Sequence, residues 1–291
     1  MNEPHYTSLV ALQARPLPPG YETATGIIRY GLTNDFMFRA VLEANPIALK
    51  GLICSMLHLD LTDVQSVVIQ NPFEFGDTVT SKDSILDIKV LMNDQTYINL
   101  EMQLLREDFW PERSLSYLCH SFLNLKEGES YNNVRPAIHI GFLDFDLFPD
   151  EPEFYATYHL ANDITHRIYT GKFALSVLSL KRIELATEND KLFGIDYWAK
   201  LFKATTWEEL RMIAENNPTL QEAAKTVYKM SDDERIQQLC FAREEHYRIL
   251  SGYQDALAEA QAALNEKNSI LAEKDAYIAE LEAKIKQLSN Q

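Results

Sequence analysis

The stretch from residue 84 to residue 105 constrains the fold of this chain more than any other. Apolar and polar side chains alternate on both sides of Asn93-Asp94, a dipeptide that favours a tight turn. This alternation predicts two β-strands joined as an antiparallel hairpin. One face of the hairpin is expected to be wholly apolar and to carry Leu86, Ile88, Val90, Met92, Ile98, Leu100, Met102 and Leu104.

The opposite face of the predicted hairpin carries two acids. A three-residue loop at 93–95 pairs Met92 with Thr96, and the same register sets Asp87 opposite Glu101, with Cβ atoms about 5 Å apart. Carboxylates this close repel each other, so a counter-charge is expected. A divalent cation such as Mg²⁺ can supply it, because Mg²⁺ binds one or two carboxylates together with waters and phosphate oxygens. The other polar residues of this face are Lys89, Asn99 and Gln103.

Several short sequence blocks, in a characteristic order and spacing, accompany the pattern Asp-x13-Glu-x-Gln formed by Asp87, Glu101 and Gln103. On these residues the chain resembles the PD-(D/E)XK nuclease superfamily, and more closely its recombination-promoting nuclease / putative transposase (Rpn-like) branch. The resemblance covers roughly residues 30–247. The blocks lie at 33–39, 86–90, 98–103, 112–117, 126–131, 136–148 and 196–202.

The resemblance implies an α/β protein with a restriction-endonuclease-like mixed β-sheet flanked by helices. It also implies a metal-dependent DNA endonuclease that hydrolyses phosphodiester bonds, with Mg²⁺ or Mn²⁺ held by Asp87 and Glu101. Gln103 stands where the superfamily motif usually has Lys, and an amide cannot supply positive charge. The Rpn-like branch commonly has Gln at this position. Lys89, on the face of Asp87, is a candidate for the missing cation.

Three further residues are candidates for the site. Asp35 opens an expected helix, where nucleases of this superfamily often place an acid; the alternative is an acid favoured there by the helix dipole. Arg113 and Tyr117 are four residues apart and share one helix face. The resemblance implies that this helix flanks the active cleft, where Arg113 would clamp a phosphate. The alternative is a surface salt bridge from Arg113 to Glu112 or Asp108.

A net charge of −16 argues against tight DNA binding, because DNA-binding proteins usually present a basic surface. A local basic cleft is expected instead, with weak, salt-dependent affinity. Two other hypotheses stay open: a catalytically silent module that binds DNA or protein, and a structural hairpin whose acids face water. The expected cleft would be built from Lys82, Lys89, Arg106, Arg113 and Lys126.

The chain is expected to divide into a loosely ordered lead-in (1–29), a nuclease-like core (30–187), a helical extension (188–249) and a coiled coil (250–291). In the last segment Leu or Ile recurs every seven residues, which predicts a homo-oligomer, most simply a parallel dimer. Lys267 and Lys274 interrupt the second stripe of that heptad, and a single helix folding back on the core is the alternative. The heptad residues are Leu250, Leu257, Leu264, Leu271, Ile278 and Ile285.

Neither a signal peptide nor an apolar run of about 18 residues is present, so we expect a cytoplasmic protein without membrane association. The three cysteines, Cys54, Cys119 and Cys240, lie far apart in apolar surroundings and are expected to be buried, reduced thiols. The seven histidines show neither zinc-ligand spacing nor a triad-like motif, so no chemistry is assigned to them.

Overall fold

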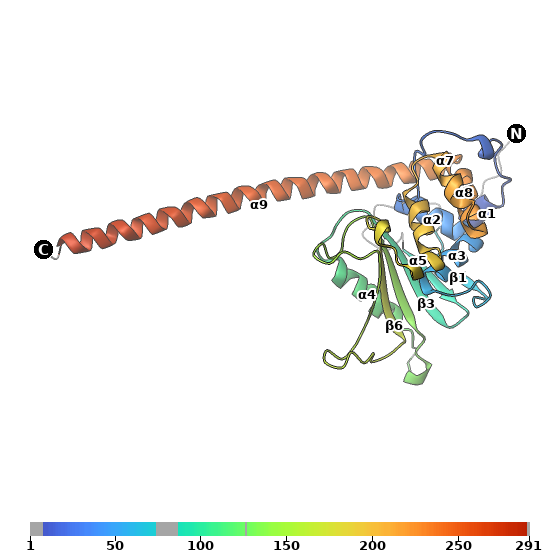
Figure 1. Ribbon diagram of the computed structural model, residues 1–291, viewed down its shortest axis with the longest axis horizontal. Helices are drawn as coiled ribbons and strands as arrows, with labels where there is room; N and C mark the ends of the chain where they lie inside the picture. Colours follow the sequence, from blue (N-terminus) through green and yellow to red (C-terminus); the bar gives the residue numbers. More distant parts are fainter. Residues whose placement is uncertain (1–7, 74–86, 126, 290–291) are drawn as a thin grey trace. The chain divides into compact units, whose positions relative to one another are not determined.

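The computed structural model describes residues 8–73, 87–125 and 127–289. Residues 84–86 of the predicted hairpin, with Leu86, lie outside the described residues. The chain separates into two compact units, one up to Glu244 and one from Glu245 onward. Figure 1 shows the elements of both units in sequence colours.

A mixed β-sheet forms the centre of the first unit. Within the described residues it has six strands in the order β1-β2-β3-β4-β6-β5, with β3, β4 and β6 parallel and the remaining neighbours antiparallel. The predicted α/β class, a mixed sheet flanked by helices, is therefore confirmed. The strands are β1 (Val67–Ile69), β2 (Ile88–Met92), β3 (Thr96–Gln103), β4 (Ala137–Leu143), β5 (Tyr155–His159) and β6 (Phe173–Ser179).

The predicted hairpin and its register are confirmed in β2 and β3. Met92 pairs with Thr96, and the ladder runs to Ile88 opposite Leu100. In the turn, Asn93 has φ 51° and Asp94 has φ 53°, a left-handed conformation that short polar side chains tolerate. The next residues beyond the paired ladder are Asp87 and Glu101, as the sequence predicts.

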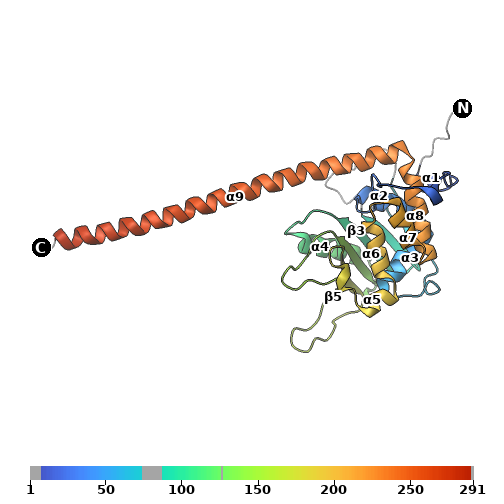
Figure 2. The same cartoon turned by 45° about the horizontal axis from the view of Figure 1, so that its top comes forward.

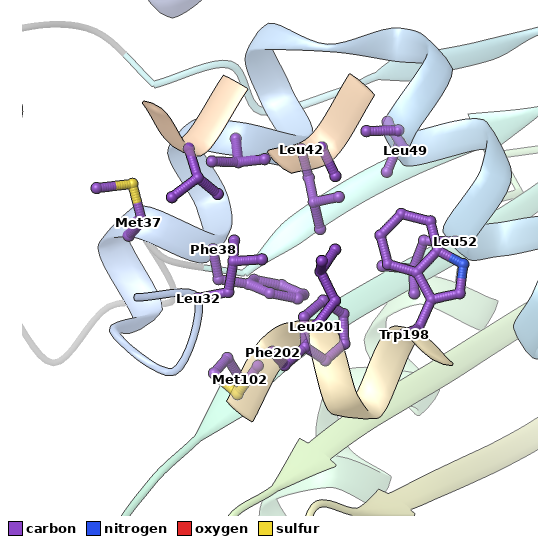
Figure 3. Close-up of a cluster of buried hydrophobic side chains, with 14 of the residues drawn as sticks. Leu32, Met37, Phe38, Leu42, Leu49, Leu52, Met102, Trp198, Leu201 and Phe202 are labelled. Carbon is purple, nitrogen blue, oxygen red and sulfur yellow. The ribbon is translucent and has the colours of Figure 1, made fainter. Parts of the chain in front are cut away.

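Helices cover the apolar face of the sheet and form the main core with it. Figure 3 shows Met102 of β3 in a cluster with Trp198 and Phe202, and with Leu42 and Leu52 from two other helices. Ile88, Val90, Ile98 and Leu100 are also fully buried in this core, as expected of the apolar hairpin face. The helices that contribute are α1 (Leu9–Gln13), α2 (Asp35–Ala44), α3 (Pro46–Leu57), α6 (Ile195–Lys203), α7 (Trp207–Ala214) and α8 (Pro218–Ser231), together with Ile236 and Cys240 at the start of α9 (Glu234–Ser289).

One helix, α4 (Trp110–Phe122), packs on the other face of the sheet, against β3, β4 and β6. Successive residues of β4 show the two faces: Phe142 enters the main core, whereas Leu143 joins a second cluster with Trp110 and Val177. Figure 2 gives a second view of α4 beside β3. The polar face of the hairpin therefore lies under a helix.

Polar side chains cap the starts of two helices. Asn34 accepts hydrogen bonds from the first turn of α2, and Thr206 does so for α7. The remaining elements are α5 (Glu188–Leu192) and the 3₁₀ turns η1 (Tyr21–Thr23), η2 (Tyr131–Asn133) and η3 (Ile183–Leu185).

Two sequence expectations need correction. The described part of the lead-in, residues 8–29, is not loosely ordered: α1 buries Leu9 and Leu12 completely, and Ile27 forms a β-bridge with Thr206. Apolar residues between the prolines supply the contacts that hold it. Cys54 and Cys240 are buried and unpaired as expected, but Cys119 is exposed because it lies on the outer side of α4.

No single helix in the described part of the chain is long and apolar enough to cross a membrane. Helices α2 and α3 pass that test only as a pair, across a bend of 109°.

A buried ion pair joins the start of α2 to the first turns of α9. Nη2 of Arg243 lies 2.6 Å from Oδ2 of Asp35, and Nε lies 3.1 Å from each carboxylate oxygen. The two side chains are 9% and 4% exposed. A charge buried at this depth needs its partner, because losing one leaves the other uncompensated.

We predict that Arg243→Ala lowers the free energy of unfolding by roughly 3–5 kcal/mol, because Asp35 would be left buried without a counter-charge. Urea denaturation followed by circular dichroism measures the change. Arg248→Ala is the control, since Arg248 is exposed and pairs with Glu245 on the surface, and its midpoint should equal that of the wild type. Equal midpoints for all three proteins would contradict the prediction.

Candidate active site

The polar face of the hairpin forms a buried cluster beneath α4. Asp87 precedes β2, while Asn99, Glu101 and Gln103 alternate along β3 and so share one face. Asp87 is 6% exposed, Glu101 4% and Gln103 5%. The hypothesis of a hairpin whose acids face water is therefore wrong. Acids at this depth need compensating charges or hydrogen bonds.

Arg113 of α4 supplies a positive charge to this cluster. Its Nη2 donates to Oε1 of Glu101 and, at 2.7 Å, to Oε1 of Gln103. Its Nη1 donates to Oε2 of Glu107 at 2.5 Å. The expected alternative, a surface salt bridge to Glu112 or Asp108, is wrong, because α4 turns the Arg113 side chain toward the sheet.

Arg113 therefore supplies a counter-charge of the kind that the close pair of carboxylates is expected to need. Burial lowers the pKa of the Arg113 guanidinium, but Glu101 and Glu107, with smaller effects of Tyr117 and Asp87, outweigh it and raise that pKa above its ordinary value. Arg113 therefore stays charged at any pH at which the fold persists.

His139 of β4 completes the cluster and is fully buried. It stands next to Asn99 in the parallel register of β3 and β4. Its Nδ1 lies 3.0 Å from Nδ2 of Asn99, an amide nitrogen that also lies 3.4 Å from Oδ2 of Asp87. Because an amide nitrogen donates, Nδ1 of His139 accepts from Asn99 in this arrangement. Nε2 of His139 lies 3.4 Å from Oε2 of Glu101.

The surroundings of Glu101 keep it ionised. Burial raises its pKa, but the contact with His139 and the charge and hydrogen bond of Arg113 together hold that pKa below its usual range. At neutral pH Glu101 is a carboxylate, the form that binds a cation.

The cluster provides oxygen ligands of the kind that a hard divalent cation binds. Oε2 of Glu101 is buried, and among the described residues it accepts no hydrogen bond of good geometry, with Nε2 of His139 at 3.4 Å. The described residues contain no group of three or more His, Cys, Asp and Glu side chains arranged to hold a metal ion. Asp87 and Glu101 together fit the one or two carboxylates that Mg²⁺ uses alongside water and phosphate oxygens.

Three other candidate residues, Gln103, Lys89 and Tyr117, differ in how closely they contact this cluster. Both ends of the Gln103 amide are engaged, because Oε1 accepts from Arg113 and Nε2 donates to the carbonyl of Leu105 at 3.0 Å. Lys89 is half-buried and pairs with Asn99 across the hairpin. The ring of Tyr117 lies 6.3 Å from that of His139, so Tyr117 shares the inner face of α4 with Arg113, as predicted.

Asp35 is held elsewhere. Both of its carboxylate oxygens accept hydrogen bonds from Arg243, so the structure supports a role for Asp35 in the fold, and we leave it out of the site. Of the expected basic cleft, Lys82 and Lys126 lie outside the described residues. Arg106 is half-exposed and pairs with Asp108 at 3.5 Å.

A family model described as PD-(D/E)XK nuclease family transposase matches residues 32–251, more than half of the chain. The chain therefore belongs to this family. Its mixed sheet with flanking helices is consistent with a restriction-endonuclease-like fold. Searches of curated proteins and of solved structures found no match.

Sequence reasoning missed His139 and Glu107. One signal was available for His139: it is the one polar side chain in the otherwise apolar β4, which reads Ala-Ile-His-Ile-Gly-Phe-Leu. A lone polar residue in a buried strand must find a partner, and the next strand supplied Asn99 and Glu101. Glu107 lies in the connection before α4, where neither strand nor helix periodicity predicts a position.

Gly141 of β4 lies beside Glu101 and leaves room for the Trp110 ring. A Cβ atom at Gly141 would lie 2.4 Å from Cζ2 of Trp110. We predict that Gly141→Ala destabilises the protein by roughly 1–3 kcal/mol, because the buried ring and α4 must shift. The shift would also displace Arg113, less than one turn further along α4.

Thermal unfolding measures this change, and Gly171→Ala is the matched control, because nothing lies within 4 Å of the added Cβ. A Gly141→Ala variant as stable as Gly171→Ala would show that Trp110 adapts without strain.

Proposed function

We propose that this protein is a metal-dependent DNA endonuclease of the recombination-promoting nuclease / putative transposase type. The observation that carries the proposal is the pair of buried carboxylates, Asp87 and Glu101, beneath the helix that bears Arg113. The resemblance assigns these two residues to the acidic positions of the motif. Family membership supports a nuclease, and DNA is the substrate that the description as a transposase favours.

In this proposal Asp87 and Glu101 hold Mg²⁺ or Mn²⁺. The bound ion would lower the pKa of a water molecule and shield the charge that develops on the phosphodiester. His139 is fully buried on the neighbouring strand, and its Nε2, 3.4 Å from Oε2 of Glu101, would help to orient that carboxylate. Asn99 links the two acids through its contacts with Asp87 and His139.

Arg113 is the residue that would bind a phosphate oxygen of the DNA backbone. Gln103 and Glu107 hold its two terminal nitrogens at 2.7 Å and 2.5 Å, which fixes the plane of the guanidinium. Its buried Nε has no hydrogen-bond partner in the described part of the chain, and Nη1 donates only to Glu107, so Nε and the second N–H of Nη1 remain. We assign Gln103 to holding Arg113, because both ends of its amide are engaged.

Asp87→Asn and Glu101→Gln are each expected to reduce Mg²⁺-dependent plasmid cleavage by at least about 100-fold, because an amide keeps the size of the side chain and loses its charge. Glu188→Gln is the control, since Glu188 is exposed on α5 and pairs with Lys191. Cleavage at the wild-type rate by either site variant, in matched Mg²⁺, would overturn the metal-site assignment. Amide variants are preferable to Glu101→Ala, which would remove one of the two acids that pair with Arg113 and leave a space beneath α4.

The alternative is a catalytically silent module that binds DNA or protein and assembles through its C-terminal helix. One observation favours it: Arg113 already pairs with Glu101, so a bound ion is not the only counter-charge available to that carboxylate. Cleavage by the wild type that is lost in Asp87→Asn supports the endonuclease, whereas absence of cleavage by both supports the silent module.

We further propose that residues 250–291 form a coiled coil between copies of this chain. The second unit is part of the single helix α9, and its heptad residues are exposed: Leu257 is 70% exposed, Leu271 56% and Ile285 65%. About six Leu or Ile side chains per helix, at roughly 1.5–3 kcal/mol each, would contribute on the order of 10 kcal/mol gross on burial. Lys267 and Lys274 in the second stripe reduce this gain.

Sedimentation at tens of micromolar, a range in which a coil of this size should associate, is expected to show an oligomer that becomes a monomer on deletion of residues 250–291. Leu264→Asp should weaken it, because a charge then replaces a heptad Leu. Ala262→Asp is the control on the same helix, two residues away and off the stripe. A full-length monomer of 33.4 kDa would contradict the proposed coil.

A further inference from the structure

A second buried ion pair, between Arg39 and Glu43 of α2, lies beside the start of β2. Arg39 is 1% exposed and Glu43 3%. Nε and Nη2 of Arg39 each lie 3.1 Å from Oε2 of Glu43. Removing two charges from water costs about as much as their attraction returns, so such a pair is weak evidence for stability. The other contacts of Arg39 and Glu43 explain why this ion pair is present.

Those contacts go to the backbone of two separate segments. Nη1 of Arg39 donates to the carbonyl oxygen of Asp87 at 2.9 Å, and Nη2 donates to the carbonyl oxygen of Asn71. Oε1 of Glu43 accepts from the backbone N–H of Phe73 at 2.8 Å. One ion pair therefore holds both the chain that follows β1 and the chain that enters β2.

The side chain of Asn71 makes a second hydrogen bond to the carbonyl oxygen of Asp87. Its side-chain Nδ2 donates to the carbonyl oxygen of Asp87 at 2.8 Å, and its Oδ1 accepts from the backbone N–H of Lys89 at 2.8 Å. The Asn71 side chain thus continues the β1–β2 ladder beyond its last residue pair, Ile69 and Val90. With the bond from Arg39, the carbonyl oxygen of Asp87 accepts two hydrogen bonds, one for each lone pair.

We propose that Arg39, held by Glu43, is a positioning residue that fixes the backbone of Asp87 so that its carboxylate stays beside Asn99, on the hairpin face that carries Glu101. Asp87 precedes the regular pairing of β2, so the sheet ladder alone leaves its backbone unconstrained. The direction of a side chain follows from its backbone, and displacement of a reacting group by about 1 Å can cost 100-fold in rate. The inference rests on the proposed function, which assigns Asp87 to the metal.

Arg39→Lys tests this role, because a lysine keeps the charge next to Glu43 and loses the planar fork that reaches three acceptors. Arg243→Lys is the matched control: it is the same substitution in the other buried ion pair of α2, the pair with Asp35. Two quantities are measured for both variants and the wild type. One is metal-free hydrogen exchange of the segment 88–90, and the other is the Mg²⁺ concentration that gives half-maximal plasmid cleavage.

We expect Arg39→Lys to lose exchange protection at 88–90 and to need about tenfold more Mg²⁺, in the range found when partners of a metal ligand are changed. Arg243→Lys should change neither quantity, whatever its effect on the melting temperature. Wild-type exchange and Mg²⁺ requirement in Arg39→Lys would overturn the proposal. Equal shifts in the two variants would overturn it as well, because they would show a general loss of stability.

A double variant, Arg39→Met with Glu43→Met, separates positioning from folding. Replacing both charges by apolar side chains often leaves stability unchanged. Melting at the wild-type temperature together with a raised Mg²⁺ requirement supports positioning, and full recovery of the wild-type requirement contradicts it. If the wild type and Asp87→Asn are both inactive, the proposed function fails, while the exchange measurement still decides whether Arg39 holds the backbone of Asp87.

Discussion

The burial of two carboxylates on one face of a central hairpin is the constraint on which the rest of the site depends. Asp87 and Glu101 lie beneath α4 and are almost inaccessible to water. Ions at that depth are stable only with opposite charges and hydrogen bonds around them. Arg113 from α4 and His139 from β4 meet that requirement, so the helix and the neighbouring strand are held to the hairpin by electrostatics as well as by packing.

Helix α2 carries two buried ion pairs that serve different purposes. Asp35 at its first turn binds Arg243 and so secures the start of α9 to the first unit. One turn later, Arg39 and Glu43 bind the backbone that leads into β2. The block Thr-Asn-Asp-Phe-Met-Phe-Arg thereby gains a physical explanation: its Asn caps the helix, its Asp and Arg anchor other segments, and two of its apolar residues, Phe36 and Phe38, fill the core.

The acidic composition also becomes easier to interpret. A net charge of −16 predicts weak attraction for DNA, and in the described residues the cation nearest the carboxylates, Arg113, is engaged by acids. A site of this kind gains positive potential mainly from a bound metal ion, whose charge can exceed that of any single side chain nearby. This charge distribution is consistent with the proposed metal site, at which the ion would add the positive charge that the acidic chain lacks.

The sequence by itself determined the hairpin, its register, the division of its two faces and the family, because alternation with period two and the turn at Asn93-Asp94 are local properties. Only the tertiary structure decided what lies above the polar face. The pairing of Arg113 with Glu101, the approach of His139 and the hold of Arg39 on Asp87 all depend on parallel strand order and helix packing between distant segments. No local pattern encodes these contacts, since each acid could have met water, a metal ion or any of several cations.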